Sequence, residues 1–118
     1  MKPATINLII YQGSTFLKEF QWKVGDPAIP MDITGYSARM QLREKLTDPT
    51  FLLELTTNNG RINLTDTVNG KFNILISATD TTNLTFKHAV YDFEFVSPDG
   101  IVTRMFGGSV ALSLEVTR

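Results

Sequence analysis

Apolar and polar residues alternate with a period of two along much of this chain. Phe16, Phe20, Trp22 and Val24 share one parity, and the residues between them are mostly charged or amide side chains. Because successive strand residues point to opposite faces, this spacing predicts a strand with one buried face. No window of helical length places apolar residues at i, i+3, i+4 and i+7. We therefore predict an almost entirely β chain, with Trp22 as the large aromatic side chain of its core.

The segment 36–43 shows the same alternation. Its apolar parity is expected to face the core, and its other parity is expected to face solvent. The apolar positions are Tyr36, Ala38, Met40 and Leu42. The outward positions are Ser37, Arg39, Gln41 and Arg43.

Three further apolar segments, 51–57, 61–65 and 71–78, are separated by Asn59-Gly60 and Asn69-Gly70. Asn-Gly supplies the positive φ angles of primed hairpin turns, so we predict that these strands form a meander. The next segment, 78–86, carries Thr and Asp cap candidates and one apolar anchor, Leu84. It is expected to form a helical turn between the sheets.

The end of the chain is expected to be a strand that runs to within a residue or two of Arg118. Its predicted inward face consists of Val110, Leu112, Leu114 and Val116. Just before it, Gly107-Gly108 is expected to mark a bulge or bend.

These segments predict seven to nine short antiparallel strands in a chain of 118 residues, which we interpret as a single domain over 1–118. The strand count and the turns between them are typical of an immunoglobulin-like β-sandwich. A small closed barrel is the alternative architecture.

Composition narrows the partners that we expect. The formal net charge is -1 and no run of like charges is present, so we expect neither nucleic acid nor a membrane as a partner. The chain has no cysteine, and His88 is its only histidine. We therefore expect no metal and no cofactor.

Two carboxylates lie two residues apart in the segment 91–96. Asp92 and Glu94 would share one strand face at roughly 6.5–7 Å, a separation that overlaps that of the carboxylate pair in glycosidases. A hydrolase built on this pair is one hypothesis. The solvated face of a strand carries such pairs routinely, and we favour that interpretation, which predicts no enzymatic activity.

The turn at Pro98-Asp99-Gly100 sets the register of the last hairpin. A three-residue loop with Gly100 in the left-handed conformation places Glu94 opposite Arg104 and Phe93 opposite Met105. Glu94 and Arg104 would then form a cross-strand ion pair. A two-residue loop would instead place Phe95 opposite Arg104.

Arg39, Gln41 and Arg43, with Tyr36 nearby, form a candidate interface. Arginine is enriched at protein contacts, and an amide and a tyrosine are compatible with a polar patch. A solvated strand face is the simpler interpretation of the same residues. Exposed strand edges offer a second way to bind a partner.

Three segments, taken in order, carry a resemblance to a known family. The first is "YQGSTFLKEFQW", with Trp22, and the second is "MDITGYSARMQLR", with Gly35. The third is "VYDFEFVSPDGIVTRMFGGSVALSLEVTR". The residues of its motif are Tyr91, Asp92, Glu94, Asp99, Gly100, Arg104 and the closing Glu-Val-Thr-Arg over 115–118. Together, the three segments resemble a family of small bacteriophage and prophage virion structural proteins that are mostly described as tail- or baseplate-associated.

The resemblance implies an immunoglobulin-like fold and a role in assembly rather than catalysis. It implies that the protein docks other virion proteins in several symmetric copies, at the tail, the baseplate or the fibre attachment. It also implies synthesis in the cytoplasm of a bacterial host and residence in the virion. Capsid decoration is the alternative location. A host-surface glycan or receptor-binding domain is the alternative function, and it would expose aromatic side chains such as Tyr11 or Tyr36.

Overall fold

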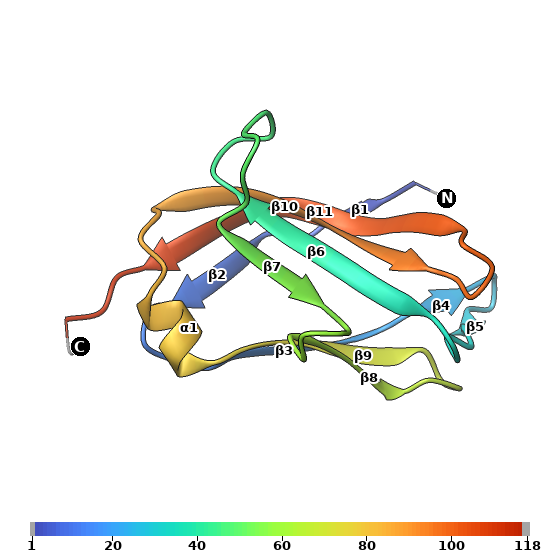
Figure 1. The fold of residues 1–118 in the computed structure, drawn as a ribbon. Coiled ribbons are helices and arrows are strands. Elements are labelled where there is room, and N and C mark those ends of the chain that lie inside the picture. Colours follow the sequence, from blue (N-terminus) through green and yellow to red (C-terminus); the bar gives the residue numbers. More distant parts are fainter. Residues whose placement is uncertain (1, 117–118) are drawn as a thin grey trace.

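The computed structural model describes residues 2–116, and these residues form two main sheets that face each other (Figure 1). Sheet A has six strands. They are β1 (Ala4–Thr5), β2 (Leu8–Tyr11), β6 (Ser37–Arg43), β7 (Leu53–Thr56), β10 (His88–Val96) and β11 (Val102–Ser113). Sheet B has three strands, β3 (Phe16–Gln21), β8 (Ile62–Asp66) and β9 (Lys71–Ile76).

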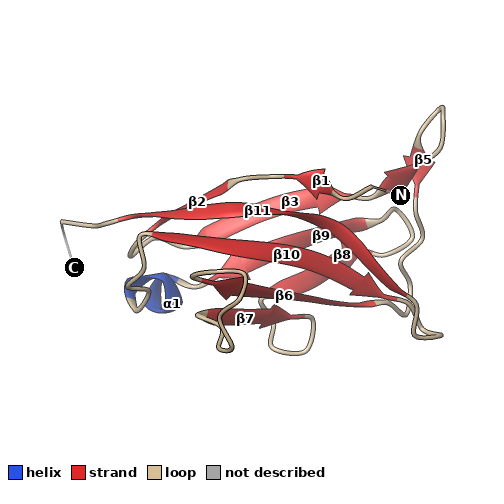
Figure 2. Ribbon diagram, turned by 90° about the horizontal axis from the view of Figure 1, so that it is seen from above, coloured by secondary structure: helices blue, strands red, loops and turns tan. Residues whose placement is uncertain are grey.

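A short two-stranded ribbon, β4 (Lys23–Val24) and β5 (Ile29–Pro30), extends from one end of the sandwich (Figure 2). The residues of both strands are exposed, Val24 included. The predicted inward position of Val24 is therefore wrong. The chain has already left sheet B at Gln21, so the alternation that begins at Phe16 no longer points at the core.

The strand order confirms the predicted immunoglobulin-like β-sandwich and excludes a closed barrel. Sheet A runs β1-β11-β10-β6-β7, and sheet B runs β3-β9-β8. In chain order from β3, omitting the β4–β5 ribbon, these strands occupy positions B, C, C′, D, E, F and G. The result is the BED and GFCC′ arrangement of such sandwiches. Eight strands have four or more residues, namely β2, β3, β6, β7, β8, β9, β10 and β11.

The sequence analysis predicted antiparallel strands throughout, and that prediction is wrong at the N-terminal edge of sheet A. Both β1 and β2 pair with β11 in parallel. Ala4 lies opposite Phe106 and Leu8 lies opposite Val110, so the two short strands keep one register along the same edge. They act as a single N-terminal strand that is interrupted at Ile6 and Asn7.

The core between the sheets is built largely from stacked aromatic rings. The ring of Phe72, from β9, lies 5.1 Å from that of Phe93, from β10, and Phe93 stacks on Phe106 at 4.8 Å. Trp22 is partly buried and stacks on Phe95 at 5.4 Å, as predicted for the large aromatic of the core. Such ring pairs contribute about 0.5–1.5 kcal/mol each beyond the area that they bury.

The predicted meander over 51–78 is wrong. β7 pairs with β6 in sheet A, whereas β8 pairs with β9 in sheet B, so the chain crosses between the sheets at Asn59-Gly60. Asn59 makes that crossing through its side chain, which accepts hydrogen bonds from the N–H groups of Thr56 and Arg61 and donates one to Glu54 O. An asparagine that bonds its neighbours' backbone can end a strand as well as turn a hairpin.

The second Asn-Gly does turn a hairpin, between β8 and β9, but not with a primed two-residue turn. Gly70 has a φ of 69°, and no other residue type has a positive φ in the described part of the chain. The loop is longer than two residues, and Gly70 N–H donates to Thr67 O over 3.2 Å. A Cβ at Gly70 would meet Trp22 O and Met31 O at 2.6 Å, so close packing as well as the turn requires a glycine.

The predicted helical turn is confirmed as α1 (Ala78–Thr82), with Leu84 buried beside it. The residue that caps it is Ser77, not a Thr or Asp. The Ser77 side chain accepts a hydrogen bond from the N–H of Asp80 at 3.1 Å. In sequence Ser77 belongs to the run that ends β9, which hides its role as a cap.

The last strand ends earlier than predicted. β11 stops at Ser113, and Leu114 and Val116 are 61% and 96% exposed. Their predicted inward positions are therefore wrong, whereas Val110 and Leu112 are buried as predicted. Thr117 and Arg118, which complete the sequence motif, lie outside the described residues.

Candidate functional site: the outer face of sheet A

The outer face of sheet A collects the polar side chains of four neighbouring strands in two rows. In one row, Gly107 of β11 lies opposite Asp92, which lies opposite Gln41, which lies opposite Glu54. In the next row, the order is Arg104, Glu94, Arg39 and Thr56. Cross-strand neighbours on one face lie close enough for their side chains to interact.

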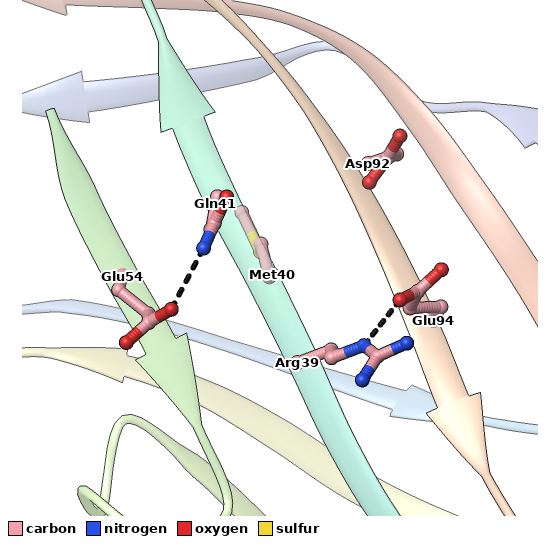
Figure 3. A pocket seen from close by; sticks show the side chains of 6 residues that line it. All are labelled: Arg39, Met40, Gln41, Glu54, Asp92 and Glu94. Carbon is pink, nitrogen blue, oxygen red and sulfur yellow. Dashed lines mark hydrogen bonds and ion pairs between the residues drawn. The ribbon is translucent and has the colours of Figure 1, made fainter. Parts of the chain in front are cut away.

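Side chains in these rows interact across the strands, and Figure 3 shows two of the contacts, Arg39 with Glu94 and Gln41 with Glu54. The Arg39 Nε donates to Glu94 Oε1, and the Arg104 guanidinium lies 3.7 Å from Asp92 Oδ2. Gln41 donates to Glu54 over 2.7 Å. The face is therefore a set of linked charges and amides rather than separate solvated side chains.

The hairpin register explains where each carboxylate finds its arginine. Ser97 N–H donates to Ile101 O, so the loop between them consists of three residues, 98–100, as predicted. Gly100 has the predicted left-handed conformation, with a φ of 88°. Glu94 lies opposite Arg104 as predicted. Phe93 lies opposite Phe106 instead of Met105, because Met105 is the extra residue of a bulge.

The predicted ion pair between Glu94 and Arg104 is wrong. Glu94 pairs with Arg39 on the strand to its other side, and Arg104 is nearest to Asp92. A bulge bends its strand and re-aims the side chains next to it, and here it directs Arg104 toward the adjacent row. The bulge itself was expected at Gly107-Gly108 and lies two residues earlier.

A shallow hollow of about 330 Å³ lies between these rows, lined by Arg39, Met40, Gln41, Glu54, Asp92 and Glu94 (Figure 3). Asp92 and Glu94 share this face, as the hydrolase hypothesis requires. Each of them, however, accepts from or lies beside an arginine of a neighbouring strand. The hollow offers a ligand a surface of compensated charge.

The loop after β6 adds an apolar side chain to this face. It rises from the end of the sheet in Figure 1, and Arg43 Nη1 anchors it by donating to Asp48 O over 2.7 Å. Leu46, in this loop, is 81% exposed. It lines a second hollow of about 130 Å³ with Val90 and Asp92, so it lies over β10.

Gly108 allows the N-terminal segment to pack closely against β11. A Cβ at Gly108 would meet Ile6 O at 2.6 Å and Asn7 Oδ1 at 2.7 Å. Asn7 Oδ1 accepts from the N–H of Ser109, and the hydroxyl of buried Tyr91 donates to Ile6 O over 2.6 Å. Sequence analysis missed this junction, because it interpreted Gly107-Gly108 only as a bulge or bend.

Tyr36 does not belong to the outer face. Its ring is partly buried and meets those of Trp22 and Phe95 edge-on at 6.2 Å and 5.9 Å. Its predicted place in an exposed contact patch is therefore wrong. Tyr11 is exposed, and with Ile9 it places apolar surface on the outer side of β2.

The remaining motif residues shape the turn end of the sheet. Gly35, with a φ of 80°, lies just before β6, and a Cβ there would touch Pro98 at 3.0 Å. Asp99 accepts from the hydroxyl of Ser97, whose Oγ in turn accepts from the N–H of Ile101 at 2.9 Å. These residues fix the loop and take no part in the rows of charge.

Residues 2–116 contain no group of three or more His, Asp or Glu side chains that could hold a metal ion. They also contain no helix long and apolar enough to cross a membrane. His88 is exposed at the start of β10.

No protein-family model and no curated protein sequence matches this chain. Among solved structures, murine CRIg is similar over 92% of this chain and 92% of its own, with 12% sequence identity and a TM-score of 0.40. A likeness at this level says nothing about what the chain binds.

Proposed function

We propose that this protein is a structural module of a bacteriophage virion, which docks other virion proteins through the outer face of sheet A. The observation that carries the proposal is the composition of that face. It combines linked charges at Arg39, Glu94, Asp92 and Arg104 with an exposed apolar side chain, Leu46, above them. Arginines beside an apolar anchor are typical of protein-protein contact surfaces.

The resemblance of three segments to virion structural proteins supports the choice of partner. Two of these segments supply the outer face, since 31–43 contains β6 and the last contains β11 and the part of β10 from Val90 onward. The tail, the baseplate or the fibre attachment is the location that we propose, in several symmetric copies. The protein acts there by binding and not by catalysis, and it needs no cofactor.

A second function, binding a host-surface glycan, has one observation in its favour. Tyr11 is 60% exposed, and an exposed aromatic ring can stack on a sugar. Tyr36, the other aromatic side chain expected to serve this role, packs in the core. Loss of glycan-array binding in a Tyr11→Ala variant would favour this function over the structural one, and an array without signal from the unaltered protein would exclude it.

Purified virions test the first function. Mass spectrometry of particles from the phage or induced prophage that carries this gene should detect the chain at a fixed ratio to the major structural proteins. Particles that are infectious and lack the chain would refute the proposal. A matched pair of variants then locates the surface. Glu94→Arg, on the outer face of sheet A, should reduce incorporation in competition with the unaltered chain, whereas Glu19→Arg, on sheet B, should not.

A further inference from the structure

The charges on the outer face of sheet A alternate in sign from strand to strand. The four strands concerned contain six charged residues, and all six face outward. They are Glu54 on β7, Arg39 and Arg43 on β6, Asp92 and Glu94 on β10, and Arg104 on β11. We call the charged residues of one strand a column. From β7 through β6 and β10 to β11, the columns carry one negative, two positive, two negative and one positive charge.

The net charges of the four strands are antisymmetric about the middle of the sheet, between β6 and β10. Reading the columns from β11 to β7 gives the same magnitudes with every sign reversed. A face with this property is complementary to a second copy of itself, as a closed two-fold contact requires, because residue i then meets j while j meets i. We propose that the outer face of sheet A binds the outer face of a second copy of this chain.

The charges also select the direction of the two-fold axis. An axis parallel to the strands, midway between β10 and β6, places β10 over β6 of the second copy and β11 over β7. Each strand then faces a strand of opposite net charge. Row by row, Glu94 and Arg39 oppose each other directly, whereas Arg104 falls over Thr56 and Glu54 falls over Gly107. An axis across the strands would instead place each column over itself, with like charges opposed. Sheets that pack face to face keep their strands within about 30° of each other, which the first arrangement satisfies.

The row that contains Glu94 and Arg39 meets itself in this arrangement. An axis parallel to the strands preserves position along them, and the two residues are directly opposite on neighbouring strands. Glu94 therefore lies over Arg39 of the second copy, and Arg39 lies over its Glu94. Each ion pair of the protomer becomes half of a group of four alternating charges.

Leu46 supplies an independent reason for a partner at this place. It is 81% exposed and lies over β10 beside Val90 and Asp92, next to the proposed axis. A second copy would cover two such leucines together. Removing this apolar surface from water would favour the association.

This inference deepens the proposed function, because it names a second copy of the chain as the virion protein that docks on the outer face of sheet A. It rests on that proposal for the biological setting, but the purified chain tests it without a virion. Analytical ultracentrifugation from micromolar to millimolar concentration should show a dimer that weakens as salt is added. Arg39→Glu and Glu94→Arg each place like charges at both contacts. Each should weaken the dimer roughly 100-fold, since opposed like charges cost several kcal/mol.

Mixing the two variants is the decisive arm. Arg39→Glu opposes Glu94→Arg with attraction at both contacts, so an equimolar mixture should form a heterodimer that neither variant forms alone. The double variant Arg39→Glu, Glu94→Arg should dimerise like the unaltered chain. Glu19→Arg, which makes the same charge change on sheet B, should have no effect.

Circular dichroism of each variant shows that loss of the dimer is not loss of the fold. An unaltered chain that stays monomeric at millimolar concentration overturns the inference, as does a mixture that associates no better than its components. Either result leaves the virion proposal intact, because the face would still be available to a different protein. If the chain forms the dimer in solution but is absent from virions, the dimer inference holds and the virion proposal is refuted.

Discussion

Glu94 lies opposite both Arg39 of β6 and Arg104 of β11, and its ion pair is with Arg39. The bulge at Met105 separates the two neighbours, because it turns Arg104 toward Asp92 in the adjacent row. Glu94 has the less exposed side chain of the two partners in its pair, at 23% against 55% for Arg39. Its carboxylate is thus held near the middle of the outer face, where the two Glu94–Arg39 contacts of the proposed dimer lie side by side.

The ion pairs of this protein should differ in what they contribute to stability. Arg61 donates twice to Asp80, over 3.0 Å and 2.9 Å, and once to Glu54 O, so it ties α1 to the crossing between the sheets. Arg61→Ala should lower the free energy of unfolding by about 1–2 kcal/mol. The exposed Arg104, at 3.7 Å from Asp92, should cost at most about 0.5 kcal/mol when changed to Ala. Urea denaturation of both variants measures the difference, and equal losses would contradict it.

The junction between β1 and β2 should depend on the Tyr91 hydroxyl. Tyr91→Phe removes the donor to Ile6 O and leaves that carbonyl without its 2.6 Å partner. We expect a loss of about 1–2 kcal/mol in the free energy of unfolding. Tyr11→Phe is the matched control, because the Tyr11 ring is exposed, and it should leave stability unchanged. No loss in Tyr91→Phe would mean that the hydroxyl does not hold this strand.

Tyr91 should also make the fold sensitive to alkaline pH. Burial raises the pKa of this phenol above its ordinary value of 10.0. A group whose pKa is raised in the folded state stabilises the fold fully below its unfolded value, and that contribution is lost as the pH rises toward the folded value. The stability difference between the unaltered chain and Tyr91→Phe should therefore shrink by about 1 kcal/mol from about pH 9 to about pH 11. A difference that is constant over this interval would contradict the burial of an ionisable group here.

Gly108 should resist any side chain. A Cβ at this position would lie 2.6 Å from Ile6 O and 2.7 Å from Asn7 Oδ1, both on the strand that pairs with β11. Gly108→Ala must displace that strand, and we expect a loss of about 1–3 kcal/mol in the free energy of unfolding. Ser109→Ala, whose exposed side chain is on the same strand, serves as the control and should change stability by less than about 0.5 kcal/mol. Wild-type stability in Gly108→Ala would show that the strand is not held this closely.

Alternation along the chain predicts the central strands well, because burial of one face determines both the sequence pattern and the orientation of the strand. The inward face of Ala38, Met40 and Leu42 and that of Tyr91, Phe93 and Phe95 are buried as expected. The same rule fails at Val24, Leu114 and Val116, where the alternation continues after the chain has left its sheet. Period-two patterning shows which side a strand buries but not where the sheet ends.

The candidate site could be predicted in its residues but not in its pairing. Arg39, Gln41, Arg43, Asp92 and Glu94 all lie on the outer face, as their parity indicates. Which arginine each carboxylate binds depends on the strand order and on one bulged residue. The placement of β6 next to β10 is a long-range feature without a local signal. The alternation of charge across the sheet therefore emerges only when the strands are assembled.

Site-specific photocrosslinking in assembled particles tests most directly whether the outer face of sheet A is a protein contact in the virion. A photoreactive residue at Ser109, on that face, should give a single crosslinked species with a virion protein or with a second copy of the chain. The same residue at Glu19, on sheet B, should give none. Crosslinks from position 19 together with none from position 109 would contradict the assignment of this face.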